Sequence, residues 1–521
     1  MLTSKHYKEF FCDSLPIQPE LIYKHRILPG DSIHVTADEV ILLERAPKKI
    51  LVGILELTGK YQYGLTSRGI PLYLCRPLDI SYPSFRVACK EKDKSTNLYV
   101  QFQFESWEEG ASIPRGSIVR ILGPVEDKSV ELEALASSVS PWSLPKSPLP
   151  VLKVKDTPDF ITGTFNIDPP GCKDIDDVLT IHKKSDGTYE LWITIADVAE
   201  YISYFSLEDI TAHKLGSTLY QNGEAVKPML PRVFSEQICS LVPGEKRRGI
   251  SYGFLLEYRS SPKPTISDLG WKSVTLINNE SYTYDSIYDS DTVPLSILHD
   301  FTSVLAGREI NDSHEWIEIC MITYNKKAAE LLVQTNEGLL RVHDQPVQTC
   351  CDTLKSIDPS LEVLGHSAAY YTTTYEAKKH HGIGSLYTHA TSPLRRYADL
   401  LNQRVIKTIL DQKHSSPGRF QDMATHLNQR QKEIKSYERD LALIDALYSS
   451  TNSVVAWVLE DTNEKGKTSC YIETWKQILT IPLGSDPVKK GQKLQLNYSC
   501  DRRKARWKDR ILFSIENILN D

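Results

Sequence analysis

Short apolar runs separated by turn-forming residues fill the first part of the chain. Runs such as residues 50–55 and 98–104 alternate with Gly, Pro and Asp, a pattern typical of short strands joined by tight turns. It predicts two successive small β-barrels of the OB or cold-shock type, over residues 1–60 and 61–145. The Ser- and Pro-rich segment 137–150 that follows predicts a linker.

Strands and long helices alternate between residues 150 and 450. The apolar run 191–196 predicts a buried strand, whereas residues 315–332 and 419–449 carry apolar side chains at helical spacing. Five short apolar runs then predict one more OB-type barrel over residues 451–521. The expected fold class is therefore an α+β multidomain protein, with a central mixed domain flanked by small OB-type β-barrels.

The bulk composition indicates the class of protein and the cellular compartment in which we expect it. Hydrophobic residues make up 40% and charged residues 25% of the 521 positions, as in ordinary soluble globular proteins. No apolar run approaches the ~20 residues that a membrane helix needs, and the first residues lack the pattern of a secretory signal. The ten cysteines form no CxxC pair, which is typical of reduced thiols. We expect an intracellular protein without membrane association, cytoplasmic or nuclear, with an organelle left open.

The most unusual stretch is residues 167–179, IDPPGCKDIDDVL, in which four aspartates fall within ten positions: Asp168, Asp174, Asp176 and Asp177. Carboxylates this close repel one another, so a positive charge is expected among them. Hard oxygen donors favour Mg²⁺, with Mn²⁺ as the alternative. Residues 160–167 predict a strand, and the Pro-Pro-Gly that follows Asp168 predicts a turn that brings the other three aspartates back to face it.

Two other interpretations of the aspartates stay open at this point. Most short Asp runs are solvated acidic loops. Residues 174–178 also fit the letters of the Asp-x-Asp nucleophile motif of haloacid-dehalogenase phosphatases. That motif should follow a buried strand directly, and here Pro-Pro-Gly-Cys-Lys precedes it, which disfavours the phosphatase.

The second unusual stretch is residues 387–399, YTHATSPLRRYAD. Pro393 suits the first turn of a helix, with Thr391 or Ser392 as its cap, and such a helix end can seat a phosphate. Arg395 and Arg396 add guanidinium groups at the same end. An ordinary capped helix with surface arginines is the alternative. Combined with the aspartates, the stretch predicts a phosphodiester-cleaving site.

These motifs resemble the catalytic (RNB) domain of the ribonuclease II family, which we place at residues 150–450. The form DPPGCKDIDD is most similar to the eukaryotic exosome exonuclease branch. Five further motifs carry the resemblance: STLY at 217–220, KPMLP at 227–231, ICSLVPGEKR at 238–247, RVHDQP at 341–346 and YTHATSPLRRYADLLNQR at 387–404.

The resemblance implies processive hydrolysis of single-stranded RNA from the 3′ end, with two Mg²⁺ ions and release of nucleoside 5′-monophosphates. It assigns metal binding to the four aspartates, cleavage to Asp174 and Asp176, and the scissile phosphate to Arg395, with Arg396 as a further RNA contact. Tyr220 matches a tyrosine that stacks near the 3′-terminal base, although its spacing alone favours a core position. Tyr284 is a looser match to another RNA-contacting tyrosine.

The C-terminal region is basic although the whole chain carries a net charge of −6. Between Glu464 and Arg510 there are twelve Lys or Arg and five Asp or Glu residues. We expect the last barrel to bind RNA through backbone contacts and base stacking, and a solvated basic hairpin is the alternative. The expected RNA-binding side chains are Arg502, Arg503, Lys504, Arg506 and Trp507.

Two departures and one rival qualify this picture. Glu318 is followed by Ile319 where the family has a second acidic residue. We also expect no endonuclease domain before the first barrel, unlike the long exosome proteins. An exosome-like or other RNA-decay complex is the partner that the resemblance implies, with a monomer as the alternative. The rival function is a catalytically inactive RNA-binding adaptor on the same fold.

Overall fold

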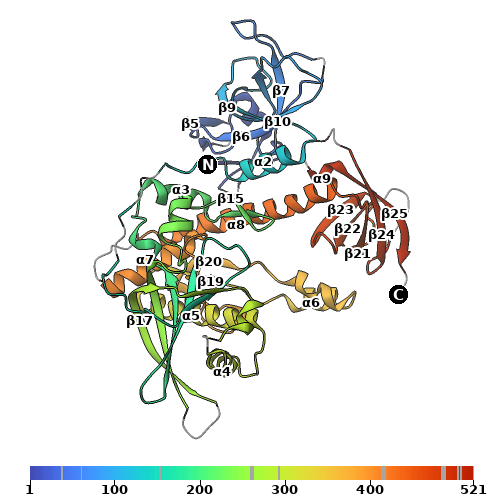
Figure 1. The fold of residues 1–521 in the computed structure, drawn as a ribbon. Coiled ribbons are helices and arrows are strands. Elements are labelled where there is room, and N and C mark those ends of the chain that lie inside the picture. The colour runs from blue at the N-terminus through green and yellow to red at the C-terminus, as the bar shows by residue number, and fades with distance from the viewer. Residues whose placement is uncertain are drawn as a thin grey trace. The chain divides into compact units, whose positions relative to one another are not determined.

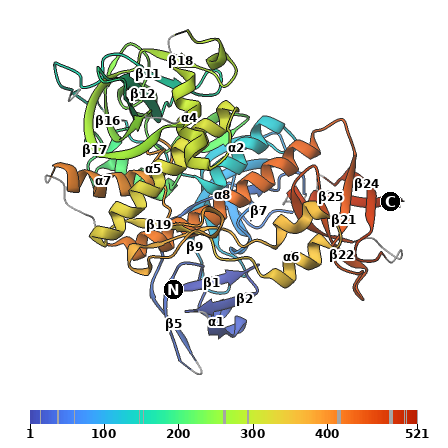
Figure 2. The same cartoon turned by 90° about the horizontal axis from the view of Figure 1, so that it is seen from below.

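The computed structural model (Figures 1 and 2) forms two compact units. Trp142–Lys432 make the central unit, and Met1–Pro141 together with Glu433–Asp521 make the barrel unit. The structure describes all residues except 14, 37–38, 60, 147, 149, 152–153, 259–262, 292–293, 412–417, 483–487, 502–503, 505–506 and 520–521, and the side chain of residue 349. In the described part of the chain, no helix is long and apolar enough to cross a membrane.

A six-stranded sheet forms the centre of the central unit, in the order β17-β16-β13-β12-β11-β18. Neighbouring strands are antiparallel except β11 and β18, which are parallel. The predicted run 191–196 lies in β13 and is buried along its whole length. The strands are β11 (Thr164–Ile167), β12 (Asp177–Lys183), β13 (Tyr189–Ala196), β16 (Lys246–Glu257), β17 (Thr265–Ile277) and β18 (Glu280–Tyr282).

Helices cover this sheet, and α5 and α7 pack against it (Figure 2). The two helices predicted from apolar spacing are α5 and α8, which confirms them. The helices are α3 (Leu207–Leu215), α4 (Leu295–Ala306), α5 (Ser313–Thr335), α6 (Gln348–Lys355), α7 (Tyr397–Asp411) and α8 (Phe420–Leu447), the last of which crosses the boundary between the units. Two small antiparallel pairs complete the strands: β14 (Leu219–Gln221) with β15 (Glu224–Lys227), and β19 (Leu339–Val342) with β20 (Tyr370–Thr373).

Short helices occupy the connections of the central unit. They are the 3-10 helices η1 (Val198–Glu200), η3 (Ser286–Asp289), η4 (Pro359–Gly365), η5 (Thr374–Glu376) and η6 (His381–Ile383), and the π-helix η2 (Val233–Ile238).

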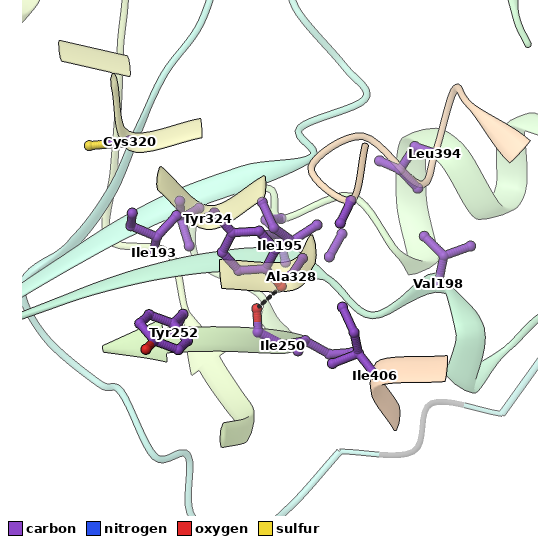
Figure 3. Packing of buried hydrophobic residues seen from close by; sticks show 14 of the residues in the cluster. Ile193, Ile195, Val198, Ile250, Tyr252, Cys320, Tyr324, Ala328, Leu394 and Ile406 are labelled. Atoms are coloured by element: carbon purple, nitrogen blue, oxygen red, sulfur yellow. Dashed lines mark hydrogen bonds between the residues drawn. The ribbon is translucent and has the colours of Figure 1, made fainter. Parts of the chain in front are cut away.

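The apolar core joins β13, β16 and α5 to the segment that precedes α7 (Figure 3). Ile195 on β13 and Tyr324 on α5 are both buried in it. The Tyr324 hydroxyl donates to the carbonyl of Ile250 on β16 at 3.0 Å, so this ring is buried with its polar atom satisfied. Leu394 reaches the same core, which anchors the turn that carries Arg395.

Buried charged side chains link α7 to the residues that follow β13. The Lys407 ammonium has no exposed surface and donates to both carboxylate oxygens of Asp197, at 3.0 and 2.9 Å, and to Glu200 at 2.5 Å. Gln403 adds two bonds to the same segment, accepting from the Ala199 amide and donating to the Ala196 carbonyl. These contacts hold the middle of α7 against the end of β13, the neighbour of β12 in the sheet.

Lys407→Ala is expected to lower the free energy of unfolding by about 3–5 kcal/mol, because it leaves Asp197 buried without its closest cation. Chemical denaturation of the parent and the variant measures this difference. Lys435→Ala, at an exposed helical position, is the matched control and should change stability by less than about 0.5 kcal/mol. Equal stability of the Lys407→Ala variant would mean that the network does not stabilise the fold.

A closed five-stranded barrel lies at the centre of the barrel unit, in the order β10-β8-β7-β6-β9. It confirms an OB-type barrel in this part of the chain. Its elements are β6 (Ile50–Leu55), β7 (Leu72–Pro77), β8 (Phe85–Ala88), β9 (Leu98–Ser106) and β10 (Arg115–Pro124), followed by α2 (Lys128–Val139). The predicted linker 137–150 therefore begins inside α2.

The predicted boundary at residue 60 differs from the structure. β6 pairs with β7 and β9, so residues 50–55 belong to the closed barrel and not to a separate barrel over 1–60. The described residues before it form a three-stranded sheet and a separate hairpin: β1 (Leu2–Lys5), β2 (Glu9–Cys12), β3 (Leu15–Ile17), α1 (Pro19–Lys24), β4 (Ser32–Val35) and β5 (Val40–Glu44). The local pattern identifies strands, but it does not say with which distant strand each one pairs.

The C-terminal part forms a five-stranded antiparallel sheet in the order β23-β22-β21-β24-β25. All five predicted runs are strands. They are β21 (Ser453–Val458), β22 (Lys467–Ile472), β23 (Gln477–Pro482), β24 (Lys493–Cys500) and β25 (Ile511–Leu519), with α9 (Trp507–Arg510) before the last. Within the described residues the sheet does not close into a barrel.

Candidate active site

Asp168, Asp174 and Asp176 lie on the connection between β11 and β12, and Asp177 is the first residue of β12. β11 ends at Ile167, and Gly171 takes a left-handed conformation (φ +79°) in the turn that follows, which glycine adopts without strain. Ser240, from the ICSLVPGEKR motif, fastens the return: its hydroxyl accepts from the Ile175 amide at 2.9 Å and donates to the Lys173 carbonyl at 2.7 Å. The connection is thereby held as a rigid loop.

A cavity of about 1070 Å³ opens over this loop. It lies wholly within the central unit, and the structure brings to it every site residue that the sequence predicted in this unit. These are Asp168, Asp174, Asp176, Asp177, Tyr220, Tyr284, Arg395 and Arg396.

Arg395 contacts the most buried of the aspartates. Its Nε donates to Asp176 Oδ2 at 3.0 Å and its Nη2 to the Ser392 hydroxyl at 3.1 Å, while the Leu394 amide donates to Asp176 Oδ1 at 3.1 Å. The Asp176 residue is 4% exposed, whereas the Arg395 side chain is 45% exposed. The guanidinium is thus fixed on one edge and open to the cavity on the other.

The predicted helix start at Pro393 is wrong. α7 begins at Tyr397, and residues 393–395 form a turn. Asp399, in the first helical turn, reaches back and accepts from the Ser392 amide at 2.8 Å and from Arg396 at 2.7 Å. Side-chain bonds of this kind compete with continued helix, so the arginines lie on the turn before the helix.

Burial raises the pKa values of three of the aspartates. It raises the pKa of Asp176 to about 7, although Arg395 acts in the opposite direction. Burial also raises the pKa of Asp168, and it raises the pKa of Asp177 well above the ordinary value, with the charges of Asp168 and Asp176 adding to the effect. Ionising all of these carboxylates at neutral pH therefore requires more positive charge than Arg395 supplies.

The donor chemistry of the site suits a hard divalent cation. The Cys172 thiol beside the aspartates has a raised pKa because of its burial and the charges of Asp168 and Asp174, so it is a neutral and weak ligand. Among the residues that the structure describes, no three His, Cys, Asp or Glu side chains already converge on one metal-binding point. The Asp168 carboxylate instead accepts a hydrogen bond from the Asn166 side chain at 2.9 Å. To bind a cation, Asp168 would exchange this hydrogen bond for the metal.

Tyr220 and Tyr284 line the cavity from different elements. The Tyr220 hydroxyl donates to Asp174 Oδ2 at 2.8 Å, so this tyrosine is not a core residue. The Tyr284 ring stacks on His314 at the start of α5, with the ring centres 3.7 Å apart and an angle of 12° between the planes. Each aromatic ring is therefore held in place beside the aspartates.

One face of α5 lines the cavity, and the sequence analysis used only part of it. Ile317, Glu318, Met321, Ile322 and Asn325 lie on this face, which follows helical spacing. Ile319, the residue that departs from the family pattern, does not line the cavity and packs against the core. The departure therefore falls outside the cavity, and the acidic residue inside it, Glu318, is retained.

A second group of cavity residues received no role in the sequence analysis, although two of them lie in the motifs RVHDQP and YTHATSPLRR. Arg341, His380 and His389 line the cavity beside Arg396. Burial, followed by the charges of Arg396 and Arg341, holds the pKa of His389 well below its ordinary range. His389 is thus a neutral imidazole, and its Nδ1 lies 2.8 Å from the Tyr371 hydroxyl.

The C-terminal RNA-binding residues need a correction at Trp507. This residue is 5% exposed, and its Nε1 donates to Glu131 Oε2 at 2.7 Å. Arg510 donates to both oxygens of the same carboxylate, at 2.7 and 2.8 Å. Trp507 therefore joins the C-terminal sheet to α2 and is not available to stack on a base. Lys504 is exposed, and the other expected residues, Arg502, Arg503 and Arg506, lie outside the described residues.

The fold and the cavity identify this chain as an RNB-domain protein. The family model "RNB domain" matches residues 159–289 and 272–412, which contain the whole cavity. The model "Dis3-like cold-shock domain 2 (CSD2)" matches residues 72–139, in the closed barrel and α2. The chain belongs to the ribonuclease II (RNB) family, as its motifs suggested.

The relatives are distant, and several are longer than this chain. The "Exosome complex exonuclease dis3" of Schizosaccharomyces pombe is 23% identical over 487 residues, covering 74% of this chain and 49% of that protein. The chain thus spans about half the length of the curated relatives it matches.

Two solved structures share the fold. RNase R of Mycoplasma genitalium, solved in complex with ribose methylated single-stranded RNA, has a TM-score of 0.73 and 18% identity, covering 99% of each chain. Yeast Ssd1, described as a pseudonuclease, has a TM-score of 0.62 and 15% identity, covering 92% of this chain and 72% of that one. The same architecture therefore occurs in a nuclease and in a protein described as inactive.

Proposed function

We propose that the protein is a hydrolytic exoribonuclease that degrades single-stranded RNA processively from the 3′ end and releases nucleoside 5′-monophosphates. The observation that carries this proposal is the single cavity in which four carboxylates lie beside a half-exposed arginine. Metal-assisted phosphodiester hydrolysis uses both parts: carboxylates to bind cations, and a positive group to stabilise the charge that develops on the phosphate.

The four aspartates would hold two Mg²⁺ ions, with Mn²⁺ as a substitute. The ions would supply charge neutralisation at the scissile phosphate and an activated water. Asp176 orients Arg395 through the bond to Nε and leaves the other edge of the guanidinium for a phosphate oxygen. Tyr220, fixed by Asp174, and Tyr284, fixed by His314, would stack on bases next to the bond that is cut.

A 5′-labelled unstructured RNA tests the proposal. With Mg²⁺ we expect a ladder of shortening products that ends in a short oligonucleotide, with nucleoside 5′-monophosphates released from the start. The reaction should stop on addition of EDTA. Internal cuts without a ladder, or release of nucleoside 3′-monophosphates, would contradict the proposal.

The second candidate is an RNA-binding adaptor without nuclease activity. One observation favours it: the fold is shared with yeast Ssd1, described as a pseudonuclease. It predicts RNA binding without cleavage in either Mg²⁺ or Mn²⁺. The same labelled-RNA assay, read alongside a binding measurement, separates the two candidates.

An RNA-decay complex is the proposed setting. Relatives from yeast and mammals are named as exosome complex exonucleases, and we propose that this chain acts in such a complex or alone, in the cytoplasm or the nucleus. Size-exclusion chromatography of the tagged protein from native extract would distinguish a complex from a monomer.

Divalent cations are expected to raise the melting temperature more at pH 8 than at pH 6. Asp176 has a pKa of about 7 in the fold and ~3.9 in the unfolded chain, so its ionisation increasingly destabilises the metal-free fold as the pH rises from about 4 to 7. A bound cation offsets that cost and competes with protons. Thermal melting with EDTA, Mg²⁺ or Mn²⁺ at both pH values measures the effect. An equal shift at both pH values, or the full shift in Asp177→Asn, would place the cation elsewhere.

A further inference from the structure

One wall of the cavity carries a buried positive charge to which the proposed function gives no role. Arg341, on β19, lines the cavity although the residue is only 7% exposed. Its Nη1 donates to the Gln431 side chain at 2.8 Å, and its guanidinium lies 4.7 Å from the centre of the Tyr371 ring. Both of these partners are neutral, so neither supplies a negative charge.

A second guanidinium raises the electrostatic cost at this wall. Arg396 lines the same cavity, and burial together with the charge of Arg396 lowers the pKa of Arg341. Asp399 acts in the opposite direction, but its carboxylate already accepts from Arg396 at 2.7 Å. A buried charge is costly unless an opposite charge compensates it. The charges around Arg341 therefore favour the binding of an anion.

Other buried cations of the central unit are paired with carboxylates. The Lys407 ammonium lies 2.9 Å from Asp197, and the Arg404 guanidinium lies 2.7 Å from Asp209. Neither of these two cations lines the cavity, so both serve the fold. Arg341 lines the cavity and contacts an amide and a ring, which favours a role in ligand binding over a structural one.

Two imidazoles on the same wall experience the positive charge of the arginines. Burial lowers the pKa values of His380 and His389, and the charge of Arg341 lowers both of them further. Both rings are therefore neutral at neutral pH, and the arginines supply the charge of this wall. Arg396 Nε and His380 Nδ1 are buried and make no hydrogen bond within the described residues. Unsatisfied buried nitrogens are uncommon in folded proteins, and beside a cavity they point to a ligand.

We propose that Arg341, with Arg396 beside it, binds a second phosphate group, separate from the phosphate at which the chain is cut. A guanidinium presents its N–H groups in a flat fork that matches the oxygens of a phosphate. Phosphate is also the anion that the proposed substrate carries. The inference therefore rests on the proposed function for the identity of its ligand.

The chemistry of the substrate limits which phosphate this is. In RNA with a free 3′ hydroxyl, the scissile phosphate joins the last two nucleosides, and no phosphate lies on its 3′ side. A second phosphate of the same strand must therefore lie upstream of the bond that is cut. Holding it would fix the register of the strand while the scissile phosphate lies beside the aspartates and Arg395. The other source of the same group is a nucleoside 5′-monophosphate, the proposed product.

Oligoadenylates that carry one methylphosphonate test the upstream phosphate. This linkage has nearly the shape of a phosphodiester but no charge, and it is placed in turn at each position near the 3′ end. Binding to the full chain is measured by fluorescence anisotropy in EDTA over a range of salt concentrations. The variants are Arg341→Met, which removes the charge, and Arg341→Lys, which keeps it. Arg308→Met is the matched control, because Arg308 is exposed and outside the cavity.

Arg341→Met is expected to lower the affinity for the unmodified strand by about ten- to a hundredfold, the usual range for one hydrogen bond to a charged group. Its log–log salt slope should fall by about 0.7, the value for one phosphate contact on a single strand. A methylphosphonate at one upstream position should weaken the parent by a similar factor and should not weaken Arg341→Met further. Arg341→Lys should keep the salt slope and lose only part of the affinity, and Arg308→Met should bind every strand like the parent.

Thermal melting in EDTA is the folding control. Arg341→Met removes a buried charge whose contacts are neutral, so its melting temperature should equal or exceed that of the parent. Competition by adenosine 5′-monophosphate separates the two sources of the phosphate. Weaker competition in Arg341→Met, with no sensitive linkage in the RNA, would assign the second phosphate to the product.

Parent-like binding by Arg341→Met would overturn the second phosphate site. A loss of affinity that no linkage and no monophosphate shares would also overturn it, because Arg341 would then act only through the structure. The proposed function fails separately: a parent with one sensitive upstream linkage that never cleaves RNA in Mg²⁺ would keep the site and remove the nuclease. A parent that cleaves RNA while Arg341→Met binds normally would do the reverse.

Discussion

Asp176→Asn is expected to lower the rate of RNA cleavage about 10³-fold while RNA affinity stays within a few-fold of the parent. The carboxylate accepts from Arg395 Nε and from the Leu394 amide at the same time. An amide of the same shape offers one oxygen and no charge, so it holds a cation far more weakly and cannot use two oxygens to accept from Arg395 and Leu394. Both losses act on the transition state more than on bound substrate.

The same substitution should not reduce stability in metal-free protein at pH 8. Burial raises the pKa of Asp176 to about 7, so the ionised side chain opposes folding above that pH, and a neutral amide removes this cost. The expected signature is therefore a large loss of rate together with an equal or higher melting temperature. Single-turnover cleavage, anisotropy binding and thermal melting in EDTA measure the three quantities.

Asp422→Asn is the matched control, since Asp422 is exposed on α8 and outside the cavity. It should leave cleavage, binding and melting unchanged. If Asp176→Asn instead weakened binding as strongly as cleavage, the carboxylate would be holding the loop and not serving the reaction.

The connection between β11 and β12 that carries the aspartates could be predicted from the sequence because its information is local. The run 160–167 and the Pro-Pro-Gly after Asp168 predict a strand followed by a turn, and the structure has β11 and then this turn. The long helices were equally accessible, since α5 and α8 each carry a continuous helical pattern. The boundary between the first two domains, predicted at residue 60, could not be placed from the sequence, because the strands that pair with β6 lie after that position.

One wall of the cavity and the position of Trp507 both depend on contacts that no local pattern contains. Arg341, His380 and His389 become neighbours of Arg396 only through the pairing of β19 with β20 and the return of the chain to α7. Trp507 lies in a basic stretch that suggested RNA, yet its partner is Glu131, 376 positions away. An aromatic residue among arginines fits a stacking platform or a buried anchor equally well, and only the position of Glu131 decides between them.

Arg395→Lys is expected to lower the cleavage rate about 10²–10³-fold, the usual cost of one lost transition-state donor. Arg395 uses Nε for Asp176 and Nη2 for Ser392, and the flat guanidinium can still direct a further N–H at a phosphate. A lysine keeps the charge but has a single nitrogen at the end of a flexible chain, so it cannot make these bonds together. Affinity should fall only modestly, because the positive charge remains.

Arg396→Lys provides the comparison, since the two arginines are neighbours with different contacts. Arg396 is paired with Asp399, which is fully buried. Its replacement should therefore lower the melting temperature clearly and change the cleavage rate of the folded protein only slightly. Arg395 lies half exposed. Its replacement should lower the cleavage rate strongly and change the melting temperature only slightly. Single-turnover rates and thermal melting of both variants measure this crossover. If Arg395→Lys cleaved as fast as the parent, Arg395 would not contact the reacting phosphate, and the positive group acting there would have to be Arg396 or Arg341 on the same cavity wall.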